Sequence, residues 1–177
     1  MWASLLKERD TVEKNPNDGE AWGRLAKAYK EIVHIGRGVR FDPAALEIFE
    51  LSRDAYEKCL VLLPKDSLWH YGYADLLWVH YFYYVYYTGE DGEGILPAAL
   101  MHLQTALALD PNNEQARYLL EDINLWMPEA VSINENGFVL LGLTATPVLP
   151  TALLPLPSET ALPAMTEITP MQTAIAT

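Results

Sequence analysis

The residues of this chain best suited to catalysis or metal binding are four histidines and one cysteine, and they are scattered. No two histidines are three or four residues apart, the spacing that puts two ligands on one face of a helix. Cys59 is the only cysteine, and a lone thiol is more often a packed side chain than a nucleophile. The histidines are His34, His70, His80 and His102. The sequence therefore predicts no catalytic residue, no metal site and no cofactor, and we expect that the protein is not an enzyme.

Residues 69–87 form the most unusual segment, because ten of these nineteen side chains are aromatic. A helix with rings on every side must be surrounded by other elements or must bind something. Two interpretations stay open. The segment is a central core helix, or some rings line a binding surface, where Tyr and Trp are favoured. A face for self-association would explain the aromatic excess equally well.

The charge of the chain is asymmetric. Residues 1–65 hold 11 Lys and Arg against 11 Asp and Glu, whereas residues 66–177 hold one basic residue, Arg117, against 13 acidic residues. The second part therefore carries the whole net charge of −12. Nucleic acid and anionic bilayers would be repelled by it, so we expect neither as a partner.

The cellular location is left open by the sequence. The run 136–158 is uncharged, but its four prolines would each remove a backbone donor that lipid cannot replace, so no membrane span is expected there. Residues 1–16 show no apolar stretch of a secretory signal, which favours a cytoplasmic location. The Thr- and Pro-rich tail favours an extracytoplasmic or surface location instead.

Three similar junctions divide the first two thirds of the chain. In each, a proline is followed two residues later by Asp or Asn, which can cap the next helix. The prolines are Pro16, Pro64 and Pro111, which are 48 and 47 residues apart. With the helical periodicity of the apolar residues, these junctions predict an all-α domain over residues 1–128. Its six helices are expected near residues 2–14, 19–34, 43–62, 67–87, 97–109 and 113–126.

Two short segments of different character follow. Asn136-Gly137 lies between two apolar runs and is a preferred dipeptide of tight hairpins, so residues 129–143 are predicted to form a β-hairpin that caps the last helix. Residues 144–177 are rich in Thr, Pro and Ala and contain no aromatic residue. This composition predicts a disordered tail, or a stalk similar to the Thr/Pro-rich stalks of bacterial surface proteins.

The helical part resembles the tetratricopeptide repeat of bacterial type, a helix pair with Trp, Leu, a small residue and Tyr on its first helix. The repeat spacing here exceeds the usual period of about 34 residues, and the excess falls in two loops, residues 36–42 and 88–94. The resemblance covers residues 1–126. In the first repeat it rests on Trp22, Leu25, Ala26, Tyr29, Ser52, Tyr56, Cys59 and Pro64.

The resemblance implies an α-solenoid in which the first helix of each repeat lines a concave groove that binds a protein or peptide. Carried over by position, the predicted contact residues come from three helices. They are Lys27 and Lys30, then Tyr71, Asp75 and Trp78, then Tyr118 and Asp122. The function expected from this resemblance is a non-catalytic scaffold for protein–protein interaction. The alternatives are a self-assembly module whose oligomer face is the aromatic helix 67–87, and a regulatory domain of a longer enzyme.

Overall fold

The computed structural model describes residues 2–35, 43–82, 94–128, 130–134 and 137–140. The chain divides into two units, residues 1–144 and 145–177, and the second lies wholly outside the described residues. The described residues also exclude most of both predicted insertion loops, residues 83–87 of the aromatic segment and the predicted tail.

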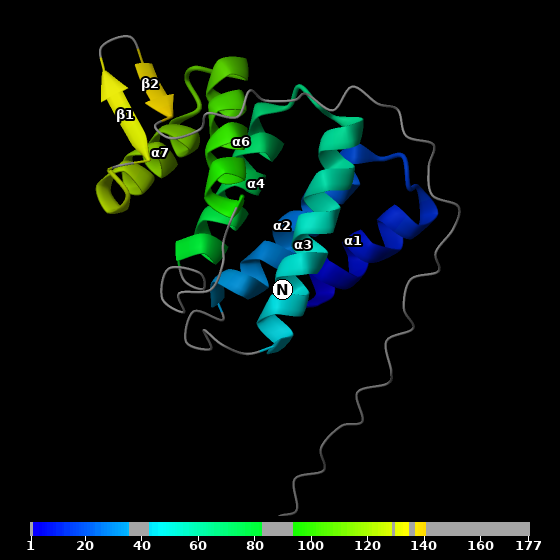
Figure 1. Ribbon diagram of the computed structural model, residues 1–177. Coiled ribbons are helices and arrows are strands. Elements are labelled where there is room, and N and C mark those ends of the chain that lie inside the picture. Colours follow the sequence, from blue (N-terminus) through cyan, green and yellow to red (C-terminus); the bar gives the residue numbers. More distant parts are fainter. Residues whose placement is uncertain (1, 36–42, 83–93, 129, 135–136, 141–177) are drawn as a thin grey trace, which may run out of the picture. The chain divides into compact units, whose positions relative to one another are not determined.

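The described part of the first unit contains six helices, followed by two short strands (Figure 1). Its helical character and its number of helices confirm the prediction. The helices are α1 (Trp2–Lys14), α2 (Gly19–Ile35), α3 (Pro43–Leu62), α4 (Ser67–His80), α6 (Ile95–Leu109) and α7 (Glu114–Trp126). The strands β1 (Val131–Asn134) and β2 (Gly137–Leu140) pair antiparallel, with Val131 opposite Leu140.

The three proline junctions form the same turn. In each, the backbone carbonyl of the residue before the proline accepts a hydrogen bond from the backbone N–H three positions later, at 3.1–3.3 Å. The side chain of this later residue accepts a hydrogen bond from backbone N–H groups in the first turn of the next helix, at 2.9–3.2 Å. The capping residues are Asp18, Asp66 and Asn113. Each cap satisfies a donor that has no partner within the helix, which fixes the start of α2, α4 and α7.

The largest difference from the predicted helix boundaries is the start of α6. The helix that was expected to begin at Pro97 begins at Ile95, after Gly94 with a left-handed φ of 87°. Proline is tolerated there because the N–H groups of the first turn have no partner within the helix. Helix α4 ends at His80, and Tyr81 and Phe82 continue in a π-helical turn; residues 83–87 of the predicted aromatic helix lie outside the described residues.

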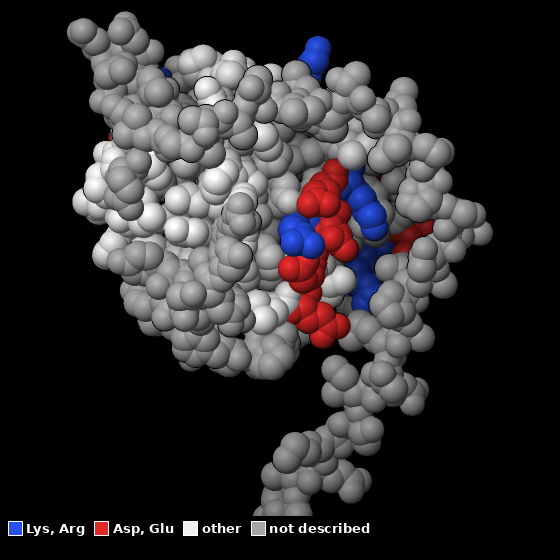
Figure 2. Space-filling model, viewed as in Figure 1, with Lys and Arg blue, Asp and Glu red and all other residues white. Residues whose placement is uncertain are grey.

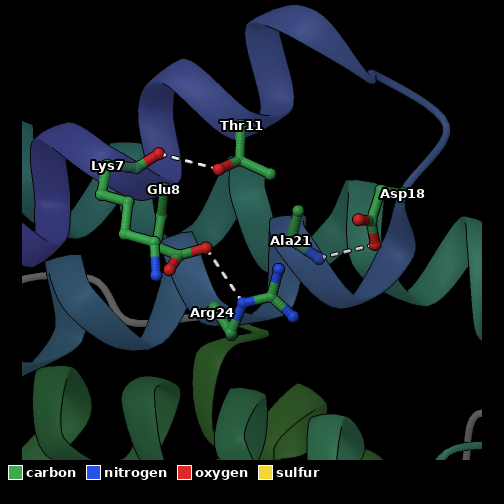
Figure 3. Close-up of polar contacts among 6 residues, drawn as sticks. All are labelled: Lys7, Glu8, Thr11, Asp18, Ala21 and Arg24. Carbon is green, nitrogen blue, oxygen red and sulfur yellow. Dashed lines mark hydrogen bonds and ion pairs between the residues drawn. The ribbon is translucent and has the colours of Figure 1, made fainter.

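Helices that are neighbours in sequence pack against each other, and α4 also contacts α2 and α7. The first helix is tied to α2 by an ion pair between the buried Glu8 and Arg24, 2.9 Å apart (Figure 3). Apolar residues form two core clusters. One lies among α1, α2, α3 and α4 and includes Ala99 of α6, and the other lies among α4, α6, α7 and β1.

Helix α4 contributes to both clusters, and nine of its 14 residues are buried. Trp69, Tyr73 and Trp78 are 6%, 6% and 3% exposed. The described aromatic rings of this helix are therefore mostly core, the first of the two interpretations that the sequence left open. Close packing also explains Gly23, because a Cβ there would lie 2.5 Å from the Trp69 ring.

Candidate partner-binding face

The seven residues predicted as contacts lie on α2, α4 and α7, and the structure joins five of them into two groups. The first group connects α2 to α4, and the second connects α4 to α7. We call the side of the three helices that carries these residues the α2–α4–α7 face. Its predicted members are Lys27, Lys30, Tyr71, Asp75, Trp78, Tyr118 and Asp122.

The first group is centred on an ion pair. Lys30 Nζ lies 2.7 Å from Asp75 Oδ2, and the two side chains are only 12% and 16% exposed. The same ammonium group lies 5.6 Å from the centroid of the Tyr71 ring, in a cation–π position. Burial, and then the Asp75 carboxylate, raise the pKa of Tyr71 to about 12, so its hydroxyl stays neutral near pH 7. This group is an internal polar contact between helices, with little surface left for a partner.

The second group is a hydrogen bond. Trp78 Nε1 donates to Asp122 Oδ2 at 2.8 Å, and the indole ring lies in the core beside Tyr81 and Phe82. The sequence predicted that Trp78 supplies apolar contact area to a partner. With 3% of its surface exposed, the side chain cannot do so in this structure. It holds Asp122 in place instead.

The exposed members of the face lie at its two ends. Lys27 is exposed on α2, and Tyr118 and Asp122 are exposed on α7, Tyr118 by 70%. Leu125 follows Tyr118 by seven residues, so helical spacing places it on the same face, and it is 73% exposed. Trp126 is 54% exposed and was not predicted.

Arg24 lies about one helical turn before Lys27 on α2. It points to Glu8 of α1, as Figure 3 shows. Since Lys30 is paired with Asp75, Lys27 is the cation of this face that is left for a partner among the described residues.

A mixed strip of charge lies elsewhere, over α3 in the view of Figure 2. Arg53 is paired there with Glu50 and Glu57 on its own helix. Alternating charges with partners at helical spacing are typical of a solvated surface. We therefore treat this strip as solvent-facing and use it as a control below.

A histidine pair connects α4 and α6 and was not predicted. His70 Nε2 lies 3.0 Å from the Pro64 carbonyl oxygen, which can only accept, so Nε2 donates. In neutral His70 the other ring nitrogen, Nδ1, must then accept from His102 Nδ1 at 3.0 Å. Burial, and then the neighbouring His70, lower the pKa of His102 to about 4. The contact is structural, and residues 32 positions apart gave no local signal for it.

The folded protein is therefore expected to lose stability in acid. In the unfolded chain the pKa of His102 is about 6.5, whereas in the folded protein it is about 4. Between pH 6.5 and pH 4 the unfolded state therefore binds more protons than the folded state. We expect the free energy of unfolding to fall by about 2 kcal/mol from this residue between pH 7 and pH 4.5. Urea unfolding at both pH values measures the loss. His102→Asn, which keeps a donor for His70, should lose less over this range, and an equal loss would assign the acid sensitivity to other groups.

No group of three His, Cys, Asp or Glu side chains in the described ranges could hold a metal ion. None of the described helices combines the length and the apolar character needed to cross a bilayer. The sequence matches no family model, and no curated protein is significantly similar to it.

Proposed function

We propose that the helical part of this chain is a non-catalytic scaffold of tetratricopeptide type that binds a protein or peptide along the α2–α4–α7 face. Three facts support a solenoid arrangement. Helices adjacent in sequence pack together, α2 and α7 both contact α4, and the same capped turn recurs at intervals of 48 and 47 residues. Stacked repeats use such neighbour contacts to bury a continuous core.

The observation that carries the binding function is the exposed apolar surface of α7. Tyr118 and Leu125 lie on the predicted contact face and are 70% and 73% exposed, although the same helix buries another set of apolar residues. Exposed aromatic and aliphatic side chains grouped on one face are typical of interaction sites. The buried groups on α2 and α4 fix the helices that present this surface.

The β-strand pair fits the role of a terminal cap in this proposal. Val131 is 2% exposed and belongs to the core cluster of α4, α6 and α7. A terminal repeat has an apolar side that its own helices do not cover, and an added element can bury it. The proposed stalk or spacer role of residues 144–177 rests on composition alone.

The self-assembly alternative is less favoured. It needs aromatic rings of helix 67–87 on the surface, whereas in the described part of this segment, which excludes residues 83–87, Trp69, Tyr73 and Trp78 are buried within one copy. The mass of the protein in solution, measured by light scattering over a concentration series, separates the two functions. A stable oligomer that survives Tyr118→Ala would favour assembly.

Site-specific photo-cross-linking in the source cells tests the scaffold. A photoreactive residue is placed at Lys27 or Tyr118, and control positions are Glu47 and Glu50 on the charged α3 strip. We expect one protein to be captured from both test positions and from neither control. Cross-linking that is absent at both test positions, or equal at all four, would contradict the proposal.

A further inference from the structure

Helix α7 has an unusual distribution of apolar residues. Its buried side is formed by Ala116, Leu119, Leu120 and Ile123, which pack into the second core cluster. The opposite side of a surface helix is normally polar. Here it carries Tyr118 and Leu125, and since successive helical residues are about 100° apart, these two lie within about 20° of each other. The exposed side therefore has an apolar ridge of its own.

Carboxylates flank this ridge on both sides. By the same helical spacing, Glu114 and Glu121 lie on one side of it and Asp122 on the other, and all three residues are exposed. Asp122 is held in place by the Trp78 indole at 2.8 Å. Arg117, the only Lys or Arg of residues 66–177, lies three residues after Glu114 and four before Glu121, at the spacing of helical ion pairs. It offsets one of the three negative charges, so an excess of two negative charges remains around the ridge.

We propose that α7 binds a cationic amphipathic segment of another protein, an inference that rests on the scaffold function proposed above. Apolar side chains of the segment pack on Tyr118 and Leu125, and its Lys or Arg residues pair with Glu114, Glu121 and Asp122. Apolar anchors surrounded by complementary charge provide both affinity and selectivity at interfaces.

The opposite chemistry is disfavoured on the same face. An acidic segment would meet three carboxylates on α7, and the cation in the centre of the face, Lys30, is already paired with Asp75. Lys27 at the α2 end can attract only one end of such a segment. A strongly polar basic segment would satisfy the charges but leave the ridge in water.

Three labelled probe peptides of equal length test the inference on the full chain. One is an amphipathic Leu/Lys helix, the second has Glu in place of Lys, and the third has Gln in place of Leu. Fluorescence anisotropy is measured at low and at physiological salt. We expect the Leu/Lys peptide to bind at least about tenfold more tightly than either of the others, and more weakly as salt rises. The Gln/Lys peptide measures attraction by net charge alone.

Two pairs of substitutions separate the ridge from its charges. Tyr118→Ala with Leu125→Ala should weaken Leu/Lys binding about tenfold or more at both salt concentrations. Glu114→Gln with Glu121→Gln should weaken it several-fold at low salt and less at higher salt. The matched control is Trp2→Ala with Leu6→Ala, which removes two apolar side chains of α1 that are 65% and 61% exposed. Asp122 is left intact because it accepts from Trp78.

The outcomes are distinct. Equal binding of the Leu/Lys and Leu/Glu peptides, or a Tyr118/Leu125 variant no weaker than the α1 control, would overturn the inference. If photo-cross-linking at Tyr118 still captures one protein through an acidic segment, the scaffold function stands and the chemistry assigned to its partner is wrong. If cross-linking fails as well, the proposed function fails with it.

Discussion

Replacement of Trp78 by alanine is expected to lower the free energy of unfolding by about 3–5 kcal/mol. The side chain is 3% exposed and lies in the cluster that joins α4 to α6 and α7, so its removal leaves a cavity at the junction of three helices. The loss of its hydrogen bond adds little, because Asp122 is exposed and water can replace the indole donor. Urea unfolding followed by circular dichroism measures the effect.

The matched control for this prediction is Trp2→Ala. Trp2 is 65% exposed on α1, so the same chemical change there should cost less than about 1 kcal/mol. If Trp78→Ala were as mild as Trp2→Ala, the ring would have to be at the surface in solution. It would then be available to a partner, as the sequence interpretation placed it.

The six helices could be predicted because their signals are local. In each junction the proline ends one helix, and the Asp or Asn two residues later caps the next. The capping residues Asp18, Asp66 and Asn113 accept the expected backbone hydrogen bonds. The start of α6 was less accurate, because the left-handed Gly94 lets the helix begin two residues before its proline. No local pattern distinguishes these two starts.

The division of the face into buried and exposed residues could not be predicted. Helical spacing placed Tyr71, Asp75 and Trp78 on one side of α4, but the same spacing suits a core stripe and a binding stripe. Which one it is depends on distant residues. Trp78 is covered by packing with α6 and α7, and Asp75 is paired with Lys30, 45 positions away. By contrast, the exposed Tyr118 lies on the last helix, where no further helix of the described chain follows.

Removal of the Lys30 cation should be the second large effect. We expect Lys30→Met to lower the free energy of unfolding by about 2–3 kcal/mol at pH 7. The Asp75 carboxylate, 16% exposed, then loses the ammonium group at 2.7 Å. A fully buried pair would cost about 3–5 kcal/mol to break, and the small remaining exposure of both side chains reduces this value.

A double-mutant cycle with Asp75→Asn isolates the pair. If the two charges depend on each other, the double variant should be more stable than the sum of the single changes predicts, by about 1–2 kcal/mol. Additive losses would mean that each residue acts through other contacts.

Lys14→Met is the control. Lys14 and Asp10 are 2.6 Å apart, but their side chains are 73% and 60% exposed, so loss of this lysine should cost less than about 0.5 kcal/mol. Since the two distances are nearly equal, a larger loss of stability in Lys30→Met than in Lys14→Met would come from burial. Such a result would support the view that Lys30 holds α2 against α4. The charges left for a partner are then Lys27 at one end of the face and the carboxylates of α7 at the other.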